Sequence, residues 1–337
     1  MVEPAGNHPE PRRFNIVVIG QTARLQYEAA LLAASLCAAG PGAGVRLIVA
    51  EPQPGPLWEY DPSIRDAETR AFLYGCGAEI LPFESRHFGQ DYAYGNKIEA
   101  LLALPPGEPF VFFDTDTLFL DPPDRVPFDF DRPCASMARE GTWPQPELYG
   151  PGHTEIWRSL YDHFGLDFES SLDPAMPEGH WERYLYFNAG WFFFRCPQEF
   201  GQRFLDYALE IRDNRPEPVQ LQPMRPWLDQ IALPLVIHSF GGGRHTIPEG
   251  LLDGSVSLHY RAMPLLYACA PDAVVAQLET LAADPALRSV IRRHGPFRRM
   301  ILEGEGHKVR ALFDRGDLPR PERLIRERIR EAGLWLR

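Results

Sequence analysis

The chain has 337 residues, 45% of them hydrophobic, and a formal net charge of −12. This composition excludes global disorder, and no apolar run reaches the roughly 18–20 residues that span a bilayer. The negative charge argues against nucleic-acid binding, because phosphate contacts require a positive surface. The five cysteines form no Cys-x-x-Cys motif, and the first residues lack the apolar stretch of a secretory signal. We therefore expect a cytoplasmic protein with free thiols.

The first hundred residues alternate between strand and helix patterns. We expect strands at residues 14–20, 44–52 and 78–84, and helices at residues 21–40, 67–77 and 94–104. Strand, helix and strand at this spacing predict a parallel α/β sheet.

The next segment is an apolar strand that ends at acidic residues. Asp114, Thr115 and Asp116 follow five apolar residues, and strand alternation predicts that the two carboxylates share one side. Ligands bind at the carboxyl ends of strands in open α/β sheets. Two carboxylates suit Mg²⁺ or Mn²⁺, which would bridge phosphate oxygens. The alternative is an exposed turn whose carboxylates cap the following element.

The rest of the chain divides near residue 263. Before that point we expect strands at residues 132–139, 184–195 and 256–260, and helices at residues 197–214 and 225–242. A long segment rich in aromatic residues, 140–185, connects two of them. After residue 263 the pattern is helical, so we divide the chain into an α/β domain, residues 1–263, and a helical extension, residues 264–337.

Five segments, in chain order, carry a resemblance to a known class of enzyme. YGNKIEALL, VFFDTDTLFL, YFNAGWFFFR, WLDQIALPLV and SLHY resemble nucleotide-sugar glycosyltransferases of the GT-A fold. The nearest type is glycosyltransferase family 8, which includes glycogenin and bacterial lipooligosaccharide galactosyltransferases. The resemblance covers roughly residues 14–260. It implies a Rossmann-type mixed α/β sheet flanked by helices, with the helical extension added at the C-terminus.

The resemblance also implies a metal centre. Asp114 and Asp116 would hold Mn²⁺ or Mg²⁺ against the donor diphosphate, and His259 would supply a third ligand. A histidine in an apolar strand is otherwise more often a core residue.

Further positions match the donor site of the family. The resemblance implies donor contacts from Gly20, Gln21, Thr22, Lys97, Thr115, Ala189 and Gly190, and catalytic roles for Asn188, Asp229 and Gln230. Taken singly, Asn188 also suits a turn or bulge, and Asp229 an ordinary helix. The family normally continues after the late histidine with glycine and then Lys-Pro-Trp, whereas this chain reads HYRAMPLLY. We expect Arg261 or Arg244 to replace the missing phosphate-binding lysine.

The function implied is transfer of a sugar, with retention, from a UDP-linked donor to a glycan, lipid-linked or other hydroxyl acceptor. Two alternatives stay open. FFDTDTLF also matches the haloacid-dehalogenase phosphatase motif, with Asp114 as nucleophile, Asp116 as acid/base and Lys308 as phosphate clamp. A catalytically inactive sugar-nucleotide-binding protein is the other.

The C-terminal segment is basic. Residues 264–337 carry a net charge of +4, against −16 for the preceding residues. Its last helix pattern interleaves arginines with Leu324, Ile325, Ile329, Leu334 and Trp335. Such a helix docks on the acidic domain, or lies on the anionic inner face of a membrane. We favour docking.

Overall fold

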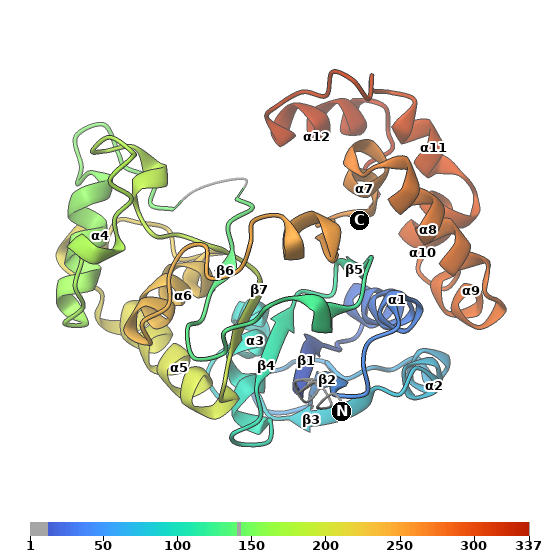
Figure 1. The fold of residues 1–337 in the computed structure, drawn as a ribbon, viewed down its shortest axis with the longest axis horizontal. Coiled ribbons are helices and arrows are strands. Elements are labelled where there is room, and N and C mark those ends of the chain that lie inside the picture. Colours follow the sequence, from blue (N-terminus) through green and yellow to red (C-terminus); the bar gives the residue numbers. More distant parts are fainter. Residues whose placement is uncertain (1–12, 140–142, 337) are drawn as a thin grey trace, which may run out of the picture.

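The computed structural model describes residues 13–139 and 143–336, which fold around a six-stranded sheet (Figure 1). The strands follow the order β3-β2-β1-β4-β7-β6. Their bounds are Phe14–Ile19 (β1), Val45–Pro52 (β2), Glu79–Phe83 (β3), Phe110–Phe113 (β4), Ala135–Ser136 (β6) and Asn188–Phe194 (β7). The sheet is mixed, because β3, β2, β1 and β4 are parallel whereas β7 is antiparallel to both of its neighbours. The predicted fold class, a mixed α/β sheet flanked by helices with a helical C-terminus, is confirmed.

Strand β1 marks the point where the order of the sheet reverses. The chain runs from β1 outward to β2 and β3 on one side, and returns to β4 on the other. Open α/β sheets bind their ligands at such a point, outside the carboxyl ends of the strands. The residues that follow β1 and β4 are therefore placed at a natural crevice.

The apolar segment around the acidic motif is not one continuous strand. Strand β4 ends at Phe113, and the chain leaves the sheet through residues 114–116. It then forms β5, Thr117–Phe119, which pairs with β8, Ser257–His259, in a separate two-stranded sheet. The predicted alternation through Asp114 and Asp116 was therefore wrong, because both lie at a joint between two sheets.

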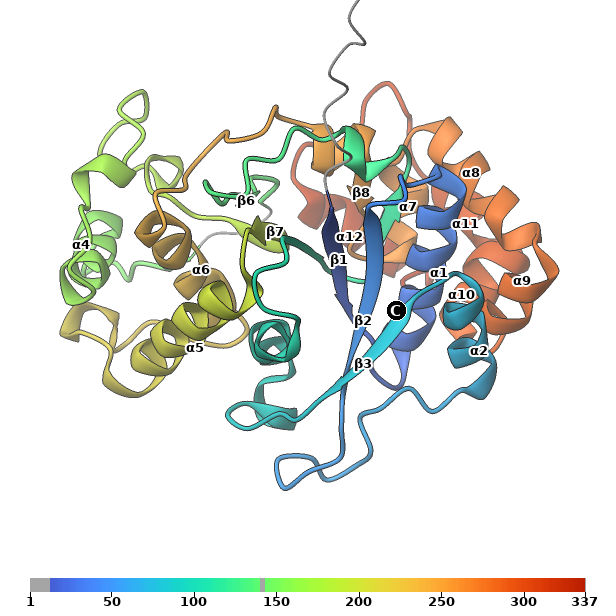
Figure 2. The ribbon, with the colours of Figure 1, turned by 60° about the horizontal axis from the view of Figure 1, so that its bottom comes forward.

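Helices cover both faces of the large sheet. Figure 2 shows α1 and α2 on one side of β1, β2 and β3, and α5 and α6 on the other. The helices up to residue 239 are α1 (Arg24–Ala39), α2 (Ala67–Gly75), α3 (Asn96–Glu99), α4 (His153–His163), α5 (Pro197–Asn214) and α6 (Leu228–Ser239). Short 3₁₀ turns occupy Gly89–Gly95, Ala100–Ala103, Pro123–Arg125, Glu169–Ser171, Trp181–Arg183 and Glu217–Val219, and π-type turns Leu251–Ser255 and Arg298–Leu302.

The C-terminal helices form a layer with its own apolar core. They are α7 (Met263–Cys269), α8 (Asp272–Ala283), α9 (Pro285–Ile291), α10 (Gly295–Phe297), α11 (Glu305–Arg310) and α12 (Glu322–Glu331). Helix α7 was not predicted. This core also includes Ala30, Leu31 and Ala34 of α1. Because the opposite side of α1 packs in the core of the sheet through Leu32 and Ala33, α1 is apolar on both sides.

The last helix docks on the rest of the protein. Ile325 and Ile329 of α12 are buried in the C-terminal core, whereas Leu324 is exposed. This packing uses the apolar face that a lipid surface would require, and it agrees with the favoured prediction of docking. Among residues 13–139 and 143–336, no helix combines the length and the hydropathy needed to cross a bilayer.

Most aromatic side chains of the long 143–184 connection are part of the core. Trp143, Trp157, Tyr161 and Tyr184 are buried. Trp143 and Trp157 meet edge to face, with ring centroids 5.2 Å apart. These four rings therefore anchor the connection to the body, and they are not free to stack on an acceptor sugar.

A histidine at the contact between α1 and the C-terminal layer makes stability depend on pH. His294 stacks on Tyr27 and meets the edge of Phe297. Burial, with the charge of Arg24 as a second cause, lowers the pKa of His294 to about 4, below its ordinary value of 6.5. Between these two pH values the unfolded chain binds a proton that the folded chain does not, so stability decreases as the pH falls.

We expect the free energy of unfolding to decrease by about 1 kcal/mol between pH 7 and pH 5 through His294, allowing for its partial exposure. His294→Asn is expected to lose this contribution, as measured by urea unfolding at both pH values. His245→Asn, at an exposed position, serves as the control. Equal pH dependence in wild type and His294→Asn would contradict the prediction.

Candidate active site

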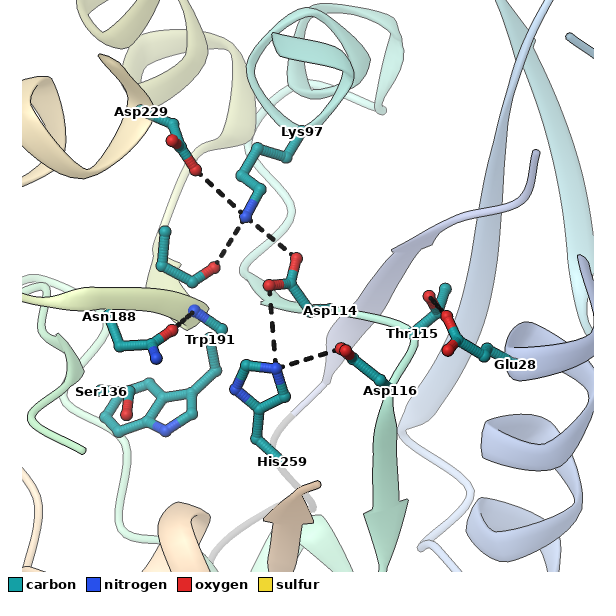
Figure 3. A network of polar contacts seen from close by, with 12 residues as sticks. Glu28, Lys97, Asp114, Thr115, Asp116, Ser136, Asn188, Trp191, Asp229 and His259 are labelled. Atoms are coloured by element: carbon teal, nitrogen blue, oxygen red, sulfur yellow. Dashed lines mark hydrogen bonds and ion pairs between the residues drawn. The ribbon is translucent and has the colours of Figure 1, made fainter. Parts of the chain in front are cut away.

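Two carboxylates and one imidazole meet at the joint between the two sheets (Figure 3). The Nε2 atom of His259 lies 3.0 Å from Oδ1 of Asp116 and 4.0 Å from Oδ2 of Asp114. One ligand atom of each residue lies within 4.8 Å of the others. All three side chains are only partly exposed. The structure therefore brings together the three residues that the resemblance implied for a metal centre.

Backbone pairing fixes the positions of these three residues. His259 of β8 is the register partner of Thr117 of β5, which places the imidazole beside Asp116. The amide of Tyr260 donates to the carbonyl of Asp116 at 2.9 Å. On the other side, the amide of Asp114 donates to the carbonyl of Gly190 at 2.8 Å, continuing the pairing of β4 with β7. The site thus forms only when strands from three distant segments come together.

A glycine in β7 makes room for the histidine. A Cβ atom at Gly190 would lie 2.3 Å from Nδ1 and 2.7 Å from Cε1 of His259. Gly190→Ala is therefore expected to displace the imidazole and to weaken Mn²⁺ binding by about tenfold or more, since ligand geometry must be held within about 0.5 Å. Titration of Mn²⁺ by calorimetry measures this effect. Gly152→Ala, where a Cβ meets nothing within 4 Å, is the control. Unchanged Mn²⁺ affinity in Gly190→Ala would refute this role.

Lys97 holds the first carboxylate from behind. Its Nζ atom lies 2.9 Å from Oδ1 of Asp114 and 3.3 Å from Oδ2 of Asp229, and it donates to the carbonyl of Ala189 at 3.1 Å. Asp229 also accepts a hydrogen bond of 2.7 Å from the hydroxyl of Tyr92. A buried ammonium between two carboxylates is fully partnered, which is the condition under which proteins tolerate a buried charge.

The charges around the joint set the protonation of each group. Burial and the neighbouring Asp116 raise the pKa of Asp114, against the opposing effect of Lys97. Burial disfavours the Asp116 carboxylate, but His259 and Arg24 lower its pKa well below the usual range. Burial likewise opposes the charged imidazole, yet Asp116 raises the pKa of His259. Because two carboxylates repel each other here, a divalent cation would relieve the strain between them.

A second buried carboxylate lies behind the motif and was not predicted. Glu28 of α1 accepts a hydrogen bond of 3.0 Å from the hydroxyl of Thr115 and pairs with Arg24 at 2.6 Å. Burial and the charge of Asp116 raise the pKa of Glu28 to about 8. Its place in an apolar helix pattern gave no sequence signal. Thr115 therefore anchors the acidic loop to α1.

The joint opens into a pocket of about 460 Å³. Of the predicted site residues, the pocket is lined by Gln21, Lys97, Asp114, Thr115, Asp116, Asn188, Gln230, His259 and Arg261. The predicted residues Gly20, Thr22, Ala189, Gly190 and Asp229 are not among the lining residues. The structure thus gathers most of the predicted site around one cavity and places the others behind its wall.

The residues behind the wall have structural contacts instead. A Cβ at Gly20 would lie 2.3 Å from Cγ1 of Val49, so glycine is needed there for packing. The amide of Thr22 donates to the carbonyl of Pro62. Asp229 is only 1% exposed and reaches the pocket through Lys97. We therefore describe Asp229 as a positioning residue and not as a group that touches the donor.

Two amide side chains face the pocket in fixed orientations. The Oδ1 atom of Asn188 accepts a hydrogen bond of 2.9 Å from the backbone of Gly190. The Oε1 atom of Gln230 accepts one of 2.8 Å from the hydroxyl of Tyr186. Each amide thus uses its oxygen on the protein and turns its NH₂ group, a donor, away from that contact.

Two predicted phosphate-binding residues lie elsewhere. Arg244 donates to the backbone carbonyls of Ser171 and Arg183 at 2.5 and 3.0 Å. It braces the 143–184 connection and does not line the pocket, so its expected role was wrong. Lys308, the clamp in the phosphatase alternative, is an exposed residue of α11 and does not line the pocket either. Arg261 does line the pocket, as expected.

The donor set fits a divalent metal ion. Two carboxylate oxygens and one imidazole nitrogen suit Mn²⁺, whereas Mg²⁺ prefers oxygen ligands alone. The remaining positions of such an ion would face the pocket, because Asp114 and Asp116 are held from behind by Lys97 and Arg24. This arrangement is typical of a site that shares its metal ion with a bound phosphate.

Comparisons with known proteins point to one class of enzyme. An active-site mutant of LgtC is 16% identical, over 80% of this chain and 95% of that chain, with a TM-score of 0.43. The galactosyltransferase LgtC with donor and acceptor sugar analogues is 15% identical, over 93% and 100%, with a TM-score of 0.38. The glycosyltransferase GlyE of Streptococcus pneumoniae TIGR4, in its apo form, is 12% identical, over 80% and 50%, with a TM-score of 0.38.

The search of curated proteins returned no match. The model of the Rhodobacterales glycosyltransferase domain matches residues 16–241, which is more than half of the chain. This range includes the acidic motif, Lys97, Asn188 and Gln230, and it ends before His259. The protein is therefore a member of the Rhodobacterales glycosyltransferase domain family, and the resemblance to glycosyltransferases is confirmed.

Proposed function

We propose that this glycosyltransferase moves a sugar from a UDP-linked donor to a hydroxyl group of a glycan or lipid-linked acceptor, and that it depends on Mn²⁺. The observation that carries the proposal is the convergence of Asp114, Asp116 and His259 on one pocket. When bound, the divalent ion would stabilise the negative charge that grows on the leaving diphosphate.

The residues of the chain would then divide the work. Lys97 keeps the Asp114 carboxylate oriented toward the pocket through their 2.9 Å ion pair. Asn188 and Gln230 present NH₂ donors that suit the hydroxyl groups of a sugar. Gln21, which follows β1 and accepts a hydrogen bond of 2.9 Å from Asn96, lines the part of the pocket next to α1. We assign it to the nucleoside side of the donor.

We further propose that the anomeric configuration is retained. Inversion requires a base, usually a carboxylate or imidazole, near the acceptor hydroxyl. Among the described residues that line the pocket, the carboxylates are Asp114 and Asp116, both part of the proposed metal centre. The imidazole is His259, which belongs to the same centre. With no separate base at hand, the departing phosphate is the natural acceptor of the proton.

A panel of nucleotide sugars in a binding assay, with and without Mn²⁺, tests the proposal. We expect one or more UDP-sugars to raise the melting temperature in the presence of Mn²⁺ only. Sugar transfer or slow donor hydrolysis should accompany this binding, and product anomers are assigned by NMR. Binding without any turnover would favour the inactive sugar-nucleotide-binding protein. Turnover of p-nitrophenyl phosphate with Mg²⁺ and no binding of nucleotide sugars would favour the phosphatase.

A further inference from the structure

Helix α12 brings a second arginine to the pocket. Arg326 lines the same cavity as Asp114 and Asp116, and Arg261, just before α7, lines it as well. Both arginines lie beyond residue 241, where the match to the family model ends. Arg326 is thus a pocket residue contributed by the C-terminal layer and not by the α/β domain.

One buried carboxylate holds these two arginines side by side. The Oε2 atom of Glu322 lies 2.6 Å from a terminal nitrogen of Arg261. The Oε1 atom accepts a hydrogen bond of 2.5 Å from Nε of Arg326. Glu322 is only 8% exposed. Because both of its oxygens are engaged, Glu322 fixes the spacing of the two guanidinium groups while leaving other N–H donors on each of them.

Packing restrains Arg326 further. Its guanidinium carbon lies 5.3 Å from the centre of the Trp335 ring, which is within the range of a cation–π contact. Ile325, the preceding residue, is buried in the C-terminal core. The arginine is therefore held in place at the pocket, and less side-chain entropy would be lost on binding an anion.

The charge of the pocket favours an anion with more than one negative charge. Its lining includes four cationic side chains, Arg24, Lys97, Arg261 and Arg326, and two carboxylates. Lys97 and Arg24 are committed to Asp114, Glu28 and Asp116. Glu322 balances only one of the remaining two charges. The uncompensated charge therefore lies on the Arg261–Arg326 side, across the pocket from the proposed metal centre.

We propose that Arg326 binds the diphosphate of the donor together with Arg261, and that Glu322 is the residue that positions both. This inference rests on the proposed function. Guanidinium groups bind phosphate oxygens in a bidentate manner. The C-terminal layer then completes the donor site instead of merely covering the α/β domain. The pair of arginines takes the place of the single lysine that is missing after His259.

Arg326→Gln tests this inference in the full-length protein, with UDP and inorganic pyrophosphate as probes in the presence of Mn²⁺. We expect the Kd of both probes to rise about tenfold or more, with an unchanged melting temperature. The affinity of the variant should also depend less on ionic strength, because one charge contact is lost. Arg326→Lys should recover part of the affinity. Arg323→Gln, on the exposed face of the same helix, should bind both probes like wild type.

The outcomes separate this inference from the function on which it rests. Wild-type binding of UDP that Arg326→Gln leaves unchanged would overturn the inference alone. A loss of affinity with an unchanged salt dependence would also overturn it, since it would indicate a structural role. A wild-type protein that binds neither UDP nor pyrophosphate with Mn²⁺ would overturn the proposed function and the inference together.

Discussion

Asp116→Asn is expected to reduce sugar transfer by about 10³-fold, because a metal ion contributes several kcal/mol of charge stabilisation and each 1.36 kcal/mol corresponds to a factor of about ten. The side chain keeps its shape and can still contact His259, so the loss would follow from the missing charge. Mn²⁺ affinity should decrease in parallel, as measured by calorimetry. Removal of Mn²⁺ with a chelator should reproduce the effect in wild type.

The same substitution separates function from stability. Asp116 repels Asp114 in the absence of a cation, and this repulsion raises the pKa of Asp114. Without the metal ion, Asp116→Asn should therefore unfold at the same temperature as wild type or higher. Asp121→Asn is the matched control, because Asp121 follows β5 and pairs with Arg125 away from the pocket. Full activity of Asp116→Asn would contradict the proposed metal centre.

Lys97→Met is expected to destabilise the protein by about 3–5 kcal/mol, since it leaves two buried carboxylates without their cation. Lys97 is 6% exposed and contacts both Asp114 and Asp229. Urea unfolding of the metal-free protein measures the effect. Adding Asp229→Asn to Lys97→Met should recover part of the stability, because one of the two unpaired charges is removed.

The chain offers a natural control for this experiment. Lys97 and Lys308 are its only lysines. Lys308 is exposed on α11, and Lys308→Met should change stability by no more than about 0.5 kcal/mol. If Lys97→Met were as mild as Lys308→Met, the three-residue cluster would not be the buried ion network described above.

Local patterns predicted the elements of the fold better than their joints. The β-branched run of β1 and the apolar pattern of α1 are evident in the sequence, and both elements begin and end within a few residues of their predicted bounds. The division between β4 and β5 was missed, because apolar residues on both sides of Asp114 and Asp116 read as one strand. Whether a strand changes its partner is decided by β8, which lies far along the chain.

The candidate site was predicted in part for the same reason. The spacing of Asp114 and Asp116 indicated a cation site directly, whereas His259 was assigned only through the resemblance. Arg326 and Glu322 carried no signal, since charged residues in an amphipathic helix usually face solvent. Their role depends on how α12 packs against α7, which is a property of the tertiary structure.

The two-sided burial of α1 has a consequence for how this architecture changes over evolution. Ala30, Leu31 and Ala34 are covered only by the C-terminal helices. An ancestor without those helices would have exposed this stripe to water, where it would promote self-association. Gain or loss of the layer must therefore be accompanied by substitutions on α1. Homologous sequences that carry charged residues at these three positions should be shorter enzymes that end soon after the late histidine.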